Sequence, residues 1–329
     1  MRPARTQGKV ALAAQSTLQA ELDIGLVVAG HGRHYVVETP DRREVLCLPR
    51  GKKSLCVVGD KVRWMPTDDS GAHGVIDGLV ERRNLLYRQD EWRSKMFAAN
   101  IDRLLVMVAA NPVFSESQLA RALIAAHQAG LNATIVLNKV DLEPAATEAR
   151  ARLAPYRAMG YEVLELALKS RAEEAVASQQ TLDARAKLNR LLDGAITVVL
   201  GPSGTGKSTL VNLMVPDAAA PVGEVSTALN SGKHTTTHTR WYWLDDAHQA
   251  ALIDTPGFQE FGMQHIELAQ LASHMPDLAR HADVCRFANC THDHEPGCGV
   301  LAALGRGEIA ASRHRIYLEL RAELGRTKW

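Results

Sequence analysis

One short glycine-rich segment at 201–209 limits the possible folds of this chain more than any other part of its sequence. The apolar run ITVVL at 196–200 leads into GPSGTGKST, which is followed by the helix-forming run LVNLM. This order of strand, loop and helix matches GxxxxGK[ST], in which backbone N–H groups and a helix N-terminus surround phosphate oxygens. The residues expected to contact the nucleotide are Gly201, Pro202, Ser203, Gly204, Thr205, Gly206, Lys207, Ser208 and Thr209. In this pattern Lys207 contacts the β- and γ-phosphates and Ser208 offers its hydroxyl to Mg²⁺.

Two further motifs complete a predicted nucleotide site. After the apolar run AALI, Asp254 begins the tetrapeptide DTPG; its carboxylate can hold Mg²⁺, and the Gly257 amide can reach a γ-phosphate. After the run TIVL, the motif NKVD comprises Asn138, Lys139, Val140 and Asp141. The carboxylate of Asp141 can accept hydrogen bonds from the N1–H and 2-amino groups of guanine, and adenine offers neither. Guanine is therefore the expected base, with adenine as the alternative.

The remaining residues of NKVD have expected roles as well. Asn138 is expected to assist at the base edge and brace the loop, and the stem of Lys139 to lie against the base plane. The stretch 167–170 follows another strand-like run and is expected to form a further base-contacting loop.

From residue 100 onward, apolar runs of strand length alternate with helical stretches, which predicts an α/β domain with a mostly parallel sheet. A helix is expected to begin after Ser115, which forms a capping box with Gln118, and to close at Gly130. The expected strands are 103–110, 134–139, 161–166, 196–202, 241–244 and 250–255. NKVD precedes the phosphate loop, whereas in Ras-like GTPases it follows. The same sheet can still form if the chain begins at its fourth strand, so the order predicts a circular permutation.

Between the phosphate loop and DTPG lies the polar segment SGKHTTTHT at 231–239. A GTPase needs a threonine here to complete Mg²⁺ coordination and sense the γ-phosphate. Ras-like enzymes place a water-orienting glutamine after DxxG, but this chain has Phe258, whose ring cannot orient water. We therefore expect slow intrinsic hydrolysis, and hypothesise that His234 positions the water once a partner orders the loop. The alternative is that His234 only contacts solvent or RNA.

The ends of the chain predict two smaller modules. Short β-branched runs between residues 24 and 87 predict a small barrel, either an oligonucleotide-binding (OB) or an SH3-like fold. Near the other end, three cysteines and a histidine suit a closed tetrahedral zinc site, with His294 as a competing ligand to the histidine. The expected ligands are Cys285, Cys290, His292 and Cys298. Cys47 and Cys56 are instead expected to be buried in the barrel.

Composition limits the classes of function. The 38 Lys+Arg residues nearly balance the 37 Asp+Glu residues, so any nucleic-acid contact must be local. Basic residues of the flanking modules are the expected contacts, namely Arg42, Arg43, Arg50, Lys52, Lys53, Arg313, Arg315 and Arg321. No apolar run approaches the length of a membrane span and no secretory signal is evident, so we expect a cytoplasmic protein without membrane contact.

Taken together, these motifs resemble the ribosome-small-subunit-dependent GTPase A family of circularly permuted GTPases. The resemblance implies an OB-fold barrel at 23–95 after a flexible tail at 1–22, a P-loop GTPase domain at 96–262 and a helical zinc-binding domain at 263–329. It also implies a monomeric enzyme that hydrolyses GTP to GDP with Mg²⁺, holds one structural Zn²⁺ and assists late maturation of the small (30S) ribosomal subunit by binding its 16S rRNA. By the same resemblance Thr236 is the Mg²⁺-binding threonine, and His234 takes part in hydrolysis.

A different class of function is also consistent with the sequence. The chain could be an RNA-binding scaffold whose nucleotide site only stabilises the fold. Stimulation of GTP turnover by small subunits separates the two readings.

Overall fold

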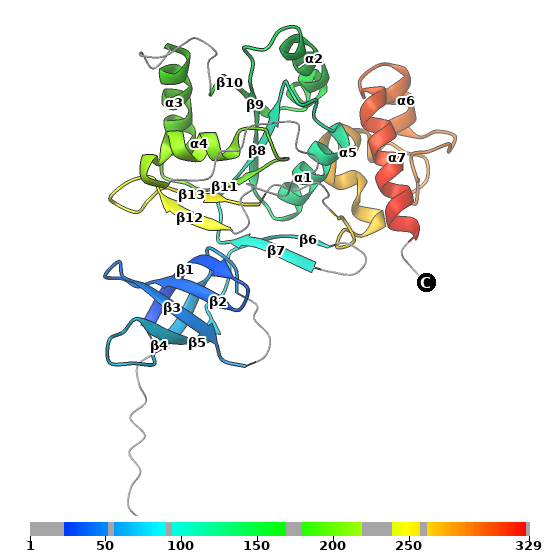
Figure 1. Ribbon diagram of the computed structural model, residues 1–329. Helices are drawn as coiled ribbons and strands as arrows, with labels where there is room; N and C mark the ends of the chain where they lie inside the picture. Colours follow the sequence, from blue (N-terminus) through cyan, green and yellow to red (C-terminus); the bar gives the residue numbers. More distant parts are fainter. Residues whose placement is uncertain are drawn as a thin grey trace, which may run out of the picture.

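The computed structural model describes residues 23–51, 56–89, 94–168, 179–218, 239–256 and 262–326. The expected tail, Lys52 and Lys53 lie outside these ranges. Within them the chain forms a barrel, a sheet with helices on both faces, and a helical C-terminal region beside that sheet (Figure 1). In the described residues no helix has the length and apolar character needed to cross a membrane.

The N-terminal barrel is a closed ring of short strands. Its members are β1 (Asp23–His31), β2 (His34–Glu38), β3 (Glu44–Pro49), β4 (Lys61–Pro66) and β5 (His73–Leu79). The ring order is β1-β2-β3-β5-β4, and β4 pairs back with β1. Because β3 and β5 are parallel, the chain must cross the barrel between them, as in the Greek-key OB fold. Of the two barrels that the sequence allows, the OB fold and the SH3-like fold, the structure therefore has the OB fold. Cys47 and Cys56 are buried, as expected.

A hairpin links the barrel to the rest of the molecule. It consists of β6 (Leu85–Gln89) and β7 (Ser94–Ala99) and spans the expected boundary at 95/96. Leu86 and Phe97 are buried in the core that also contains the central sheet. This hairpin is not among the elements that the sequence predicts.

The central sheet contains every strand expected for the α/β domain. These are β8 (Arg103–Ala109), β9 (Asn132–Asn138), β10 (Glu162–Leu166), β11 (Ile196–Leu200), β12 (Arg240–Trp243) and β13 (Ala251–Asp254). The order is β10-β9-β8-β11-β13-β12, parallel except for β12. The strand that carries NKVD thus lies two places from the strand that leads into the phosphate loop, although it comes first in the chain. This is the permuted arrangement that the motif order predicts.

Helices cover both faces of this sheet because alternate strand residues point to opposite sides. On one face, α1 (Glu116–Gln128) and α2 (Ala145–Ala158) pack against residues such as Leu104 and Val106. On the other, α3 (Gln179–Leu192) and α4 (Lys207–Met214) pack against residues such as Leu105 and Met107. A 3-10 turn, η1 (Pro216–Ala218), follows α4.

The first of these helices begins where the capping box predicts. The Ser115 side chain accepts a hydrogen bond from the backbone N–H of Gln118 (3.2 Å), and Gly130 adopts φ +67° after the helix ends.

The C-terminal region is helical and continuous with the core of the central sheet. It contains the 3-10 turns η2 (Leu268–Gln270) and η3 (Ala272–His274), then α5 (Pro276–Ala282), α6 (Gly299–Gly305) and α7 (Ala311–Arg326). Buried residues from it, such as Leu278 and Leu320, join the apolar cluster under α1 and α2. The two domains therefore share one core.

One expectation about α7 is wrong. Arg313 is not an exposed RNA-binding residue; its side chain is 3% exposed and donates to Asp277 on α5 at 2.8 and 3.2 Å. Its guanidinium also lies 5.0 Å from the ring centre of Tyr156 on α2. Helical periodicity turns Arg313 toward the core while Arg315 stays exposed, and a buried carboxylate balances the charge.

Candidate functional site

The phosphate-binding loop runs from the end of β11 to the start of α4. Gly204 and Gly206 adopt positive φ angles (+81° and +102°), which other residues rarely do. A Cβ atom on Gly201 would lie 2.4 Å from the carbonyl oxygen of Met107 on β8. Glycine is therefore required at these positions by the backbone conformation and by close packing. The helix α4 begins directly at Lys207. The loop and the helix N-terminus form the anion-binding arrangement that the sequence predicts.

Lys207 is buried within the loop. Its Nζ donates to the carbonyl oxygens of Gly201 (2.8 Å) and Pro202 (3.0 Å). Burial lowers the pKa of Lys207 to about 8, although the Asp254 carboxylate acts in the opposite direction. The ammonium is thus held in place by the loop but is poorly solvated, so an anion placed here would favour its charged form.

The strand β13 places the second motif beside the loop. In the parallel pairing of β11 with β13, Asp254 lies opposite Val199. Thr255, which the sequence analysis assigned no role, is fully buried and donates through Oγ1 to the Val199 carbonyl oxygen (2.8 Å). This bond fixes the turn that follows Asp254. The Asp254 carboxylate and the Ser208 hydroxyl are oxygen donors of the kind that Mg²⁺ prefers, so this part of the site fits that ion.

The NKVD motif meets the phosphate loop through Asn138. This residue ends β9, and its Nδ2 donates to the carbonyl oxygen of Thr205 (2.8 Å). Its Oδ1 accepts from the backbone N–H of Leu168 (3.2 Å), within the predicted base-contacting stretch. One buried side chain therefore ties together three loops from distant parts of the chain. The expected bracing role of Asn138 has a structural basis, and its partners could not be named from the sequence.

The rest of the motif lies at the surface of the same edge. Lys139 adopts φ +62°, and its Nζ donates to the carbonyl oxygen of Asn111 (2.7 Å). The Val140 N–H donates to the carbonyl oxygen of Leu166 (3.2 Å), which secures the turn, and Asp141 is exposed. Since β9, β11 and β13 are parallel, all three motifs gather at the carboxyl ends of the strands, where such sheets bind ligands.

Other predicted site residues lie outside the described residues. These are His234, Thr236, Gly257 and the stretch 169–170, together with Phe258.

The predicted zinc ligands form one compact cluster. The ligand atoms of Cys285, Cys290, His292 and Cys298 all lie within 4.8 Å of one another. His294 is excluded as a ligand because its side chain is 81% exposed and faces Asp293. Of the two histidines left open by the sequence, His292 is therefore the one that lies with the cysteines, and its backbone adopts φ +57°.

The spacing of the cluster fits zinc. Tetrahedral Zn²⁺ with Zn–S bonds of about 2.3 Å and Zn–N bonds of about 2.0 Å requires separations of about 3.8 Å for S···S and 3.5 Å for S···N. The two Sγ atoms of Cys285 and Cys298 are 3.8 Å apart, and each lies 3.5 Å from His292 Nδ1. The backbone N–H groups of Gly299 and Leu301 donate to these sulfurs at 3.3 and 3.4 Å, which favours thiolates. Four protein ligands indicate a structural rather than a catalytic ion.

Comparison with known proteins agrees with this arrangement. The sequence model of the RsgA GTPase family matches residues 79–264, which include NKVD, the phosphate loop and DTPG. The chain belongs to the RsgA GTPase family. RsgA GTPases are hydrolases that act on GTP, so the site described above is that of a GTPase, with Mg²⁺ accompanying the nucleotide.

Individual relatives extend the match to the whole chain. A small ribosomal subunit biogenesis GTPase RsgA from Variovorax paradoxus (strain S110) is 54% identical over 332 residues, covering 100% of this chain and 99% of the relative. One of the same name from Burkholderia pseudomallei (strain K96243) is 53% identical over 297 residues, 90% of each chain. YjeQ from Thermotoga maritima superposes with a TM-score of 0.67 at 27% identity, covering 92% of this chain and 99% of YjeQ. YloQ, described as a circularly permuted GTPase, shares the fold with a TM-score of 0.66 at 24% identity, covering 96% and 99%.

Proposed function

We propose that this RsgA-family chain is a Mg²⁺-dependent GTPase of small (30S) ribosomal subunit biogenesis, acting in the cytoplasm as a monomer. The observation that carries the proposal is the contact of Asn138 with Thr205, which joins the guanine-specifying motif to the phosphate loop. The relatives named for small-subunit biogenesis support the biological role. The near-complete coverage of the first relative extends that support to both flanking modules.

Guanine selection is assigned to Asp141. Its exposed carboxylate follows the Val140 turn at the edge where the loops meet, and can accept from guanine N1–H and the 2-amino group. Asn138 positions this turn against the phosphate loop, and Lys139 flanks it. Adenine would leave the carboxylate without donors and desolvated, which disfavours ATP.

Phosphate binding is assigned to residues 201–209 and Lys207 in particular. The Nζ bonds to Gly201 and Pro202 are exchanged for bonds to phosphate oxygens, which stabilise the ammonium more strongly than neutral carbonyls do. Ser208, Asp254 and Thr236 would hold Mg²⁺, which neutralises charge on the phosphates when bound. The Gly257 amide is assigned to the γ-phosphate.

Hydrolysis requires a group that orients water. Phe258 cannot do so, and we assign that role to His234 in the small-subunit complex. His234→Ala should then abolish the subunit-stimulated turnover while leaving the slow intrinsic turnover unchanged. If stimulated turnover survives in this variant, His234 has no catalytic role.

RNA contact is assigned to the barrel and the zinc module, with 16S rRNA as the ligand. Arg42, Arg43 and Arg315 are exposed on these modules and can reach phosphates. GTP would favour the subunit-bound state, and hydrolysis to GDP would release the protein.

The decisive experiment measures hydrolysis of GTP and ATP, each with and without purified small subunits. We expect turnover of GTP only, slow alone and faster with subunits. Asp141→Asn should reduce GTP binding, and Asp246→Asn, an exposed aspartate distant from the motif in sequence, serves as its matched control. An unchanged rate with subunits would favour the scaffold reading, and ATP turnover unaffected by Asp141→Asn would favour an ATPase.

A further inference from the structure

The strand β12 lies between the barrel strand β1 and the strand β13, which ends in Asp254 (Figure 1). Its first residue, Arg240, pairs on one side with Ala29 of β1. On the other side Arg240 pairs with Asp254 of β13. Two short steps through paired backbone therefore connect the barrel to the carboxylate assigned to Mg²⁺. In the sequence, β12 also directly follows the threonine-rich segment at 231–239.

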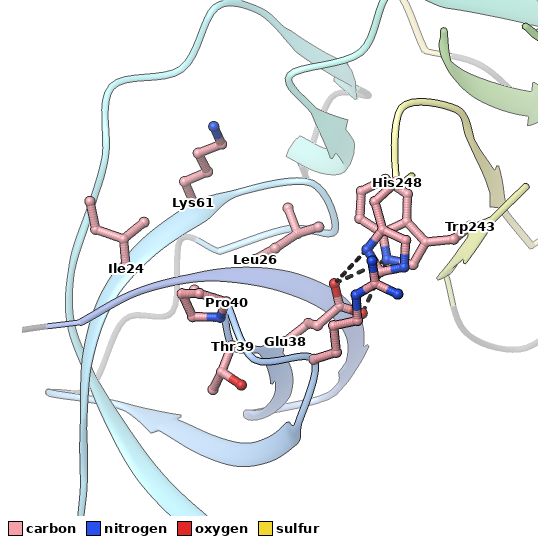
Figure 2. Close-up of a pocket in the computed structure, with 10 residues that line it drawn as sticks. Ile24, Leu26, Glu38, Thr39, Pro40, Lys61, Trp243 and His248 are labelled. Carbon is pink, nitrogen blue, oxygen red and sulfur yellow. Dashed lines mark hydrogen bonds and ion pairs between the residues drawn. The ribbon is translucent and has the colours of Figure 1, made fainter. Parts of the chain in front are cut away.

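The other end of β12 is held by a side chain of the barrel. Glu38, at the end of β2, accepts the indole N–H of Trp243 through both carboxylate oxygens, at 3.0 and 3.1 Å (Figure 2). The His248 ring stacks on the Trp243 indole, with centroids 4.2 Å apart and planes 9° apart. His248 Nδ1 lies 3.8 Å from Glu38 Oε1. Glu38 thus contacts the central domain through two aromatic side chains, from the strand and from the turn that follows it.

Beside this contact the seam between barrel and sheet is open to solvent, although Val28 and Trp241 share a buried apolar cluster elsewhere along it. A cavity of about 340 Å³ lies between them, lined on the barrel side by Ile24, Leu26 and Pro40 and on the other by Trp243 and His248 (Figure 2). Arg42 crosses the same seam by donating to the carbonyl oxygen of Asp246 (2.8 Å). On this side of the seam, barrel and sheet are joined by a few directional hydrogen bonds next to open space. Contacts of this kind can change more readily than close-packed side chains can.

From this geometry we propose that Glu38 is a positioning residue for the stimulation of GTP hydrolysis, and not for intrinsic hydrolysis. Through Trp243 and β12, it transmits the binding of rRNA by the barrel to Asp254, and so contributes to stimulation by the small subunit. The inference rests on the function proposed above, because it requires stimulation to exist. Glu38 contacts neither nucleotide nor reacting atoms in this scheme; it acts through the strand.

The test compares Glu38→Ala and Trp243→Phe, singly and together, in the full-length protein. GTP turnover is measured alone and over a range of small-subunit concentrations, which separates maximal rate from half-saturating concentration. We expect the maximal stimulated rate to fall by at least about fivefold in each variant. Intrinsic turnover and the half-saturating concentration should stay within error of the original protein. The double variant should fall no further than either single variant, because both remove one shared contact.

Glu44→Ala is the matched control. Glu44 lies opposite Glu38 on β3 and is exposed. Its replacement by alanine gives the same change of charge as Glu38→Ala, and this control variant should behave as the unaltered protein. Trp243→Phe removes the indole N–H that Glu38 accepts but keeps an aromatic ring beside His248. A loss of stimulation seen in both variants therefore cannot come from misfolding of Glu38→Ala alone.

Three results would overturn the inference. These are an unchanged maximal rate, a change only in half-saturating concentration, and equal losses of intrinsic and stimulated turnover. If the unaltered protein itself is not stimulated, the proposed function fails, and the inference fails with it.

Discussion

Asn138 Nδ2 lies 2.8 Å from the carbonyl oxygen of Thr205, and both groups are buried. A Cβ atom on the neighbouring Gly206 would lie 2.3 Å from the same Nδ2. The NKVD motif and the phosphate loop are therefore in direct contact, with no room for a side chain between them. This single relationship makes two distant motifs one binding site.

Replacing Asn138 should destabilise the protein even without nucleotide. Asn138→Ala removes the donor to Thr205 and the acceptor for Leu168 N–H. Two buried backbone groups would lose their partners, at a cost of about 2–4 kcal/mol in the free energy of unfolding. Asn138→Asp keeps the acceptor but places a carboxylate oxygen against the Thr205 carbonyl, so it should also weaken the protein. Urea denaturation measures both, and a loss below about 0.5 kcal/mol in Asn138→Ala would contradict the bracing role.

Nucleotide affinity should decrease as the pH rises, because Lys207 loses its proton in the free protein. Burial lowers its pKa to about 8 in the free protein, whereas phosphate oxygens favour the ammonium and raise the pKa in the complex. Above pH 8 the free protein lacks the proton that the complex carries, so binding takes up a proton. Affinity for GDP should fall by up to about tenfold per pH unit above this value.

Titrations with a fluorescent GDP analogue from about pH 7 to pH 9 would measure this slope. Lys207→Arg is the control, since its guanidinium stays charged throughout and its affinity should not follow the same slope. An equal slope in both proteins would assign the effect to another group.

Zinc binding should require the side chain of His292 and not that of His294. Only His292 lies within the cysteine cluster, and His294 is exposed. We expect His292→Ala to lose the ion and to lower Tm, while His294→Ala keeps one zinc per chain. Metal analysis of the purified variants, with melting curves before and after chelation, provides the measurement. Zinc retained by His292→Ala would contradict the assignment.

The buried ion pair of Arg313 with Asp277 should be important for stability. Arg313→Ala leaves the Asp277 carboxylate buried without its partner, which costs about 3–5 kcal/mol. Replacing both by apolar residues, as in Arg313→Met with Asp277→Leu, should cost far less, because no charge is left buried. Arg315→Ala on the exposed side of α7 should change stability by less than about 0.5 kcal/mol. Chemical denaturation of the four proteins tests this order, and equal losses for Arg313→Ala and Arg315→Ala would refute it.

Local sequence patterns account for the helices and strands and for most of the chemical motifs. The strands of the central sheet, the helix start at Ser115 and the OB-or-SH3 barrel follow from local periodicity and turn residues, whose physical causes act within a few residues. The phosphate loop, NKVD and the zinc cysteines are likewise short motifs, in which spacing along the chain nearly fixes spacing in space. The circular permutation could be predicted because each motif is recognisable by its own residues, whatever its position in the chain.

Which distant residues meet depends on the packing of the whole chain. The barrel topology depends on the pairing of β3 with β5, and the ligand at the zinc site on the turn at His292. The burial of Arg313 depends on α2 and α5 packing against α7, which the basic composition of that helix conceals. The contacts of Asn138 with Thr205 and of Glu38 with Trp243 join residues far apart in the sequence. Such contacts are set by how whole layers pack, because burial and directional hydrogen bonds are satisfied by neighbours in space rather than along the chain.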